Sequence, residues 1–208
     1  ALEKKNYEVS TPVQAGAIPP MLAWKDVLAK APTGTGKTFA FGIPILEHIN
    51  PADDQVQAVI LAPTRELALQ ITEELRELAV YMEGVKIICC YGGQPIGKQI
   101  NALKRHPQII VATPGRFSDH MKRRTIKVDA VQTVVLDEAD RMLDMGFIHD
   151  VTRILDKIPH RRNLGLFSAT ISREVMDIAW VYQRDAEEIT VRAVEENKPD
   201  IVQYRVDT

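Results

Sequence analysis

The sequence predicts an α/β fold, a three-layer αβα sandwich in which helices cover both faces of a mainly parallel sheet of about seven strands. Short apolar runs alternate with amphipathic segments of helical period along the 208 residues. Strands separated by helices are joined by right-handed parallel crossovers. The 45 % hydrophobic content is that of a globular protein with a sizeable core, and the length fits one large domain.

The elements follow from the same alternation. Sheets of this kind bind ligands at the carboxyl ends of their strands, where the motifs below fall. Residues 195–208 are predicted to be a linker that leads into a further strand, so the main domain is assigned to residues 1–194. Strands are predicted at 26–31, 57–62, 85–91, 108–112, 131–137, 163–168 and 187–192, and helices near 12–23, 37–49, 65–82, 95–105, 115–123, 147–157 and 172–182.

A phosphate-binding loop is predicted after the first strand. Residues 31–38 read Ala-Pro-Thr-Gly-Thr-Gly-Lys-Thr, which departs from the usual pattern only in an alanine where a first glycine is common. Gly34 and Gly36 let successive amide N–H groups turn towards phosphate oxygens, and the helix that opens at Thr38 favours anions through its dipole. Lys37 is expected to reach the β- and γ-phosphates and the Thr38 hydroxyl to bind Mg²⁺.

Carboxylates follow the buried run at residues 131–136. Asp137 is expected to hold Mg²⁺ through water, because this ion keeps much of its hydration. Glu138 is placed to orient or deprotonate an attacking water. Alone, the acidic residues 137–140 could equally form a helix N-terminus. Their position after a buried strand and downstream of a phosphate loop favours the catalytic interpretation.

At these residues the chain resembles the DEAD-box ATP-dependent RNA helicases of superfamily 2, and specifically their N-terminal RecA-like domain. The similarity covers nearly the whole chain, with the short motifs in the family's order. Besides the phosphate loop and the tetrad, the matches are Tyr7 with Thr11-Pro12-Val13-Gln14 (Q motif), residues 63–68 (motif Ia), Gly92-Gly93 (glycine doublet), residues 113–116 (motif Ib) and Ser168-Ala169-Thr170 (motif III).

The resemblance implies that ATP is the nucleotide. The amide of Gln14 offers one donor and one acceptor, which suit the N6 amino group and N7 of adenine. Tyr7 either packs on the adenine face or is a core tyrosine. The implied nucleotide-binding residues are Tyr7, Gln14, Thr33, Gly34, Thr35, Gly36, Lys37 and Thr38, with Thr38 and Asp137 as the metal-binding pair.

The family grips single-stranded or duplex RNA by its sugar-phosphate backbone. Arginines, hydroxyls and backbone amides at helix starts suit phosphates. Purely structural roles stay open for some of these residues. Arg116 could cap a helix, and Thr64 and Thr113 could be plain N-caps. Residues 146–147 could be a helix break with an apolar anchor. The implied RNA-binding residues are Pro63, Thr64, Arg65, Gly92, Gly93, Thr113, Pro114, Gly115, Arg116, Gly146 and Phe147.

The resemblance also implies a link between ATP use and RNA. Ser168 and Thr170 carry short hydroxyls at the end of a predicted strand, and hydrogen bonds from them to Asp140 would join the two sites. Asp140 is therefore expected to couple the sites and not to bind metal. The catalytic residues implied are Lys37, Asp137, Glu138, Asp140, Ser168 and Thr170.

Charge and composition narrow the remaining possibilities. The formal net charge is −2, so the chain is not basic overall, although residues 122–127 and 160–162 are locally basic and are solvated helix ends or binding patches. Cys89 and Cys90 are adjacent in a strand and point to opposite faces, which suits buried free thiols. No run of about 18 apolar residues occurs and the start lacks a secretory signal, so a cytoplasmic, monomeric chain without membrane contact is expected.

Nothing after Thr170 resembles the motifs of the family's second RecA-like lobe, which supplies arginine fingers. The chain is therefore expected to bind nucleotide, to hydrolyse ATP very slowly and not to unwind duplexes by itself. Two other functions stay open. The ATP site could switch an RNA clamp or docking lobe, and a DNA translocase is a third alternative, disfavoured by Gln14 and Asp140.

Overall fold

The computed structural model describes residues 9–192. Seven strands form one sheet in the order β3-β4-β2-β5-β6-β1-β7, and all neighbouring strands are parallel. The sheet is built from β1 (Val27–Lys30), β2 (Ala58–Leu61), β3 (Ile87–Cys90), β4 (Ile109–Ala112), β5 (Thr133–Asp137), β6 (Asn163–Ser168) and β7 (Glu187–Thr190). The predicted sheet is confirmed.

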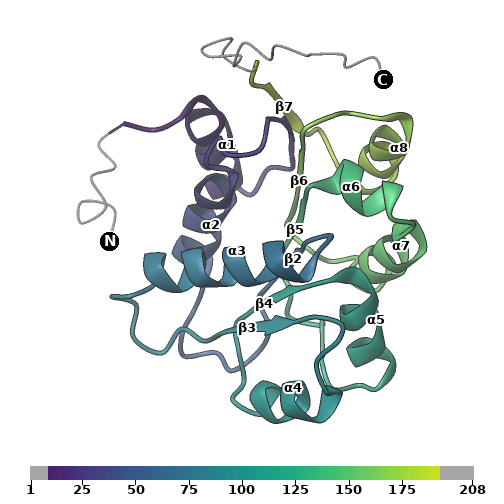
Figure 1. Cartoon of the computed structure of the whole chain (residues 1–208). Helices are drawn as coiled ribbons and strands as arrows, with labels where there is room; N and C mark the ends of the chain where they lie inside the picture. Colours follow the sequence, from purple (N-terminus) through teal and green to yellow (C-terminus); the bar gives the residue numbers. More distant parts are fainter. Residues whose placement is uncertain (1–8, 193–208) are drawn as a thin grey trace, which may run out of the picture.

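Helices cover both faces of the sheet (Figure 1). One buried cluster joins α1, α2 and α3 to one face, and a second joins the later helices to the other face. The helices are α1 (Pro12–Leu22), α2 (Lys37–His48), α3 (Arg65–Leu78), α4 (Ile96–Leu103), α5 (Pro114–Lys122), α6 (Ala139–Asp144), α7 (Ile148–Asp156) and α8 (Arg173–Tyr182). The predicted three-layer sandwich is therefore confirmed.

Alternate residues of each central strand belong to opposite cores. In β2, Ala58 and Ile60 face the first cluster, whereas Val59 and Leu61 face the second. Because helices cover both faces, the strand has an unbroken apolar run instead of a polar and apolar alternation. The two free cysteines follow the same rule, since Cys89 packs against the first cluster and Cys90 lies in the second.

The observed elements differ from the predicted ones in one helix. The sequence pattern did not predict α6, which is only six residues long and follows β5 directly. Its first turn contains Asp140, so the acidic tetrad does form a helix start, whereas the catalytic interpretation of the tetrad stays a prediction. The predictions for Tyr7, for the boundary near residue 194 and for residues 195–208 lie outside the described residues.

The register of the strands positions the site. Lys30 of β1 pairs with Ser168 of β6, and Asp137 of β5 pairs with Phe167 of β6. Since β6 lies between β1 and β5, the loop after β1 and the acidic residues after β5 meet at one edge of the sheet. Between residues 9 and 192, no helix has the length and apolarity needed to cross a membrane.

Candidate functional site

The loop between β1 and α2 is shaped for an anion. Gly34 and Gly36 have φ of 79° and 84°, in the left-handed region that favours glycine. The Thr35 hydroxyl donates to the Pro32 carbonyl at 2.8 Å and closes the turn. The space beside Gly34 is open, and the loop borders a cavity of about 790 Å³. This is the geometry in which backbone amides face a phosphate.

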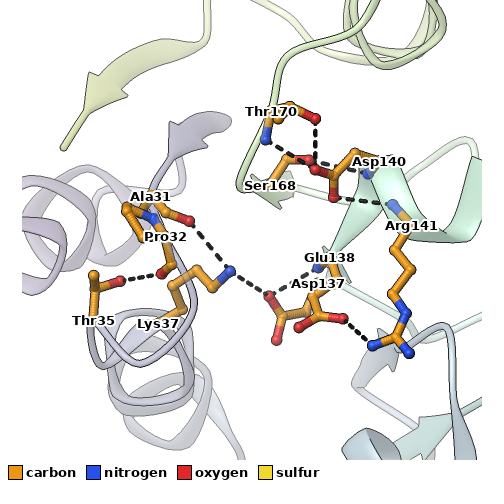
Figure 2. Close-up of polar contacts among 10 residues, drawn as sticks. All are labelled: Ala31, Pro32, Thr35, Lys37, Asp137, Glu138, Asp140, Arg141, Ser168 and Thr170. Carbon is orange, nitrogen blue, oxygen red and sulfur yellow. Dashed lines mark hydrogen bonds and ion pairs between the residues drawn. The ribbon is translucent and has the colours of Figure 1, made fainter. Parts of the chain in front are cut away.

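Lys37 begins α2 at the head of this cavity and is 6 % exposed. Its ammonium group donates to the carbonyl of Ala31 at 3.3 Å and lies 3.9 Å from the Asp137 carboxylate (Figure 2). The pair is buried, but the distance is at the outer limit of an ion pair. Lys37 and Asp137 therefore face each other across a gap instead of closing a tight salt bridge.

Burial raises the pKa of Asp137 to about 6, while Lys37 and the backbone amide of Glu138 partly oppose the shift. That amide donates to Asp137 Oδ1 at 3.0 Å. A loosely paired, buried carboxylate of this kind is costly, and perturbed acids concentrate at functional sites. Among residues 9–192, no three His, Cys, Asp or Glu side chains form a metal cluster. A protein cage for a cation is therefore not formed by these residues.

Glu138 has a strained backbone. Its φ and ψ of 50° and 51° are left-handed for a non-glycine residue, and it occupies the N-cap position of α6. The carboxylate accepts from Arg141 at 3.2 Å, as Figure 2 shows. Both Glu138 and Arg141 line the cavity. Sequence reasoning missed Arg141, and its spacing of three residues from Glu138 on a helix was the available signal.

Gln14 joins α1 to the glycine loop. Its amide accepts from the Thr11 backbone N–H at 2.9 Å and donates to the Gly36 carbonyl at 3.2 Å. The Thr11 hydroxyl also donates to the Thr35 carbonyl at 2.8 Å. One amide hydrogen and one lone pair of Gln14 stay available beside the cavity, which Gln14 and Thr11 line. The predicted adenine contact of Gln14 stays a prediction.

Asp140 is linked to the end of β6, as the sequence predicts for Thr170. Its Oδ2 accepts from both the hydroxyl and the amide of Thr170, at 2.7 and 2.9 Å. Ser168 also contacts Asp140, since its hydroxyl forms a hydrogen bond with the carboxyl group and accepts from the backbone N–H of Asp140 at 3.0 Å. Partial burial alone would raise the pKa of Asp140, but the hydroxyls of Thr170 and Ser168 and two backbone amides outweigh it and lower the pKa.

The predicted RNA-binding residues gather at the carboxyl edge of the sheet, after β2, β3 and β4. Thr64 caps α3 by accepting from the Leu67 amide at 3.3 Å, so the plain N-cap role exists. Thr113 precedes α5 and makes no side-chain cap. Arg65 is exposed, and its guanidinium lies 4.8 Å from the centre of the Tyr91 ring. Pro63 and Pro114 are buried, whereas Gly92 and Gly93 are exposed.

Arg116 is not a free charge in this structure. Its guanidinium donates to the Gln94 carbonyl at 2.9 Å and to Gln99 Oε1 at 3.1 Å. Gln99 is buried, and its amide also contacts Tyr91, Gln94 and His120. Sequence reasoning missed this network because no motif marks Gln99. A phosphate contact of Arg116 stays a prediction.

Residues 146–147 lie beside the start of α5. Gly146 has φ of 82° and ends α6, with its amide donating to the Leu143 carbonyl at 2.9 Å. Phe147 is half-buried, and a Cβ placed on Gly115 would lie 3.9 Å from its ring. The helix break with an apolar anchor is therefore present. It also brings residues 146–147 against one of the predicted RNA-binding segments.

These features together define a nucleotide-binding α/β domain of the P-loop class. The glycine loop fits phosphates, and the Thr38 hydroxyl, the Lys37 ammonium and the Asp137 carboxylate lie at its rim. Hydroxyl and carboxylate oxygens are the ligands that suit Mg²⁺, and because the described residues form no cluster of three acidic, histidine or cysteine ligands, the remaining ligands would be phosphate and water.

Comparison with known proteins identifies the family. Residues 11–178 match the model of the DEAD/DEAH box helicases. The chain is 49 % identical over 204 residues to the DEAD-box ATP-dependent RNA helicase CshA of Geobacillus kaustophilus, and 48 % identical to CshA of Bacillus subtilis. These matches cover 98 % of the chain but only 44 % and 41 % of the two relatives.

Solved structures of similar proteins point to the same family. A DEAD box protein from Methanococcus jannaschii matches with a TM-score of 0.87 and 41 % identity, over 92 % of this chain and 52 % of that one. A hypothetical ATP-dependent RNA helicase from Sulfolobus tokodaii matches with a TM-score of 0.85 and 38 % identity, over 91 % and 55 %. The chain belongs to the DEAD/DEAH box helicase family and corresponds to its N-terminal RecA-like domain.

Proposed function

We propose that this chain is the ATP-binding lobe of an ATP-dependent RNA helicase, which couples ATP binding and hydrolysis to local unwinding or remodelling of RNA duplexes. The observation that carries the proposal is the juxtaposition of Lys37 and Asp137. Lys37 begins α2 after the glycine loop, Asp137 ends β5, and the two charged groups lie 3.9 Å apart beside the cavity. The fold and the family support the same assignment.

Several residues that line the cavity have a role in this proposal. Lys37 places its positive charge where the β- and γ-phosphates would lie, and Gly34 and Gly36 turn backbone amides to them. The Thr38 hydroxyl and the Asp137 carboxylate would hold Mg²⁺. Bound ATP would supply the phosphoryl group that is transferred to water. The Glu138 carboxylate is the group that would orient this water or accept its proton.

The nucleotide base is proposed to lie against the segment before α1. The free donor and acceptor of the Gln14 amide would read adenine, with Thr33 and Thr35 in the loop nearby and Tyr7 on the base. Because Gln14 also bonds the Gly36 carbonyl, the base-reading amide is attached to the phosphate loop. We propose that, through this hydrogen bond, a change in the conformation of the phosphate loop shifts α1.

RNA is proposed to bind along the same edge of the sheet through its sugar-phosphate backbone. The exposed Arg65 and the amides of Gly92 and Gly93 are open to a phosphate. The link from Asp140 to Thr170 would connect this strand to ATP use. The second RecA-like lobe of the full protein would complete the site, with residues 1–194 as the first lobe and residues 195–208 leading to the second.

The proposal predicts nucleotide binding with very slow turnover for the 208-residue chain. Fluorescent ATP binding and RNA-stimulated phosphate release should be measured beside full-length CshA of Geobacillus kaustophilus. Turnover is expected to be lower by about 10³–10⁵-fold, because the arginine fingers of a second lobe are absent. Lys37→Ala should weaken nucleotide binding at least about tenfold. Turnover close to that of the two-lobed protein would contradict the proposal.

A further inference from the structure

The end of the domain opposite the nucleotide cavity is hollowed by two adjacent cavities of about 600 and 540 Å³. They share Arg124, Ile126 and Lys127, and we call their combined surface the basic groove. Its walls include residues 54–56 before β2 and Pro107 before β4. Parallel strands begin at one edge of a sheet and end at the other, so the groove is remote from the predicted ATP and RNA sites.

The groove is lined by an excess of cations. Within residues 9–192, none of the lining residues Lys104, Lys122, Arg124, Lys127 and Lys157 has an ion-pair partner. The charge of Asp54 in the wall is balanced by Lys86 at 3.4 Å, and Asp129 is the other lining carboxylate. A cluster of this kind attracts acidic partners although the chain as a whole has a net charge of −2.

Two residues of the groove have a costly backbone conformation. His106 and Arg124 follow the ends of α4 and α5 with φ of 55° and 56°. This position after a helix usually belongs to glycine, which reaches the left-handed region without strain. Gly146 fills the equivalent position after α6 in the same chain. Trp24 and Asp185 have the same conformation elsewhere in the chain. The conformation therefore supports the groove only by placing the side chains of His106 and Arg124 beside it.

The floor of the groove is apolar. Leu103 and Ile126 are 9 % and 5 % exposed, and the half-buried Val56 and Ile100 lie beside them. No phenylalanine, tyrosine or tryptophan lines either cavity. RNA held by its phosphates needs cations but no apolar floor, and RNA held by its bases stacks on aromatic side chains, whereas apolar pockets bordered by charge suit peptide side chains. The surface therefore fits a protein segment better than RNA.

We propose that the basic groove is a docking site for an acidic protein segment with interspersed apolar side chains. Its carboxylates would pair with Lys104, Arg124 and Lys127, and its apolar side chains would contact Ile126 and Leu103. Cations at helix ends also complement the helix dipole. The helix dipole explains the position of Lys104 at the end of α4. It does not explain Lys127, which lies outside the helices, or Arg124, whose backbone is left-handed.

Peptide binding tests the proposal independently of the nucleotide site. The 208-residue chain should be titrated into a panel of fluorescein-labelled peptides that alternate Glu or Asp with Leu or Phe. Fluorescence anisotropy should show saturable binding that weakens with added salt. Peptides with Ser in place of the apolar residues should bind more weakly, and peptides with Lys in place of the acids should not bind. Absence of binding across the panel would overturn the proposal.

Groove variants locate the binding. Arg124→Gly should be at least as stable as the parent chain, since glycine suits the turn, and should weaken peptide binding about fivefold. Lys104→Glu combined with Lys127→Glu should abolish it. Arg173→Glu, a single charge reversal at the exposed start of α8 and outside the groove, is the control and should have little effect. Unchanged peptide binding by the groove variants would overturn the proposal. It would also be overturned if these variants lost affinity for oligouridylate while keeping their affinity for the peptides.

Discussion

The Asp137 carboxyl group destabilises the fold when it is ionised. Burial raises its pKa to about 6 from an ordinary value of 3.8, despite Lys37 at 3.9 Å. Between about pH 4 and pH 6 the folded chain therefore holds a proton that the unfolded chain has lost. Stability falls as the pH rises through this window, and the full cost applies above it. A residue kept at such a cost is expected to have a function beyond the fold.

Replacing Asp137 with asparagine should remove this cost. Asp137→Asn is expected to raise the free energy of unfolding by up to about 3 kcal/mol at pH 8, and by less at pH 5, where the folded parent is already protonated. Urea unfolding at both pH values measures the difference. The same change should abolish the extra stabilisation that Mg²⁺ adds to ATP binding. Asp144→Asn, an exposed position on α6, is the control and should show neither effect.

Among the elements, α4 and α5 are joined to the segment after β3 by one buried side chain. The Gln99 amide donates to the Tyr91 carbonyl and to Gln94 Oε1, both at 2.9 Å. Its oxygen accepts from Arg116 and contacts His120 Nε2, and burial lowers the pKa of His120. All four hydrogen-bonding positions of the amide are used. Gln99 therefore fixes the position of a predicted RNA-binding loop.

Gln99→Leu should loosen that loop. The change leaves several buried polar groups without partners and is expected to destabilise the chain by about 2–3 kcal/mol. Hydrogen exchange should accelerate at residues 92–94, and RNA affinity should fall while ATP affinity is retained. Gln132→Leu, at an exposed glutamine before β5 that lies outside the nucleotide cavity, is the matched control. Unchanged exchange at residues 92–94 would show that Gln99 does not position the loop.

The sequence predicted the helices and strands better than the contacts between side chains, and the reason is physical. The strands were found because helices bury both faces, as with Ala58–Leu61, and that burial leaves long apolar runs. The phosphate loop was found because its glycines are required locally. The Gln99 network and the bond between the Ser168 hydroxyl and the Asp140 backbone depend on neighbours distant in the chain, so no local pattern marks them.

At the scale of the whole molecule, one sheet edge holds both the nucleotide cavity and the predicted RNA-binding segments. The Asp140–Thr170 contact at 2.7 Å joins the helix after β5 to the end of β6. Asp140 lies on α6, three residues after Asp137, and Thr170 lies on the segment between β6 and α8. A change at Thr170 should therefore affect communication between the sites more than either binding event.

A two-lobed chimera tests this coupling. Residues 1–194 joined to the remaining part of Geobacillus kaustophilus CshA should regain RNA-stimulated ATP turnover, because the second lobe completes the site. Thr170→Val keeps the shape of the side chain but removes the hydroxyl that donates to Asp140. In the chimera it should lower RNA stimulation by about tenfold and leave ATP affinity within about twofold, as expected for a coupling contact. An equal loss of ATP affinity would instead make Thr170 part of the nucleotide site.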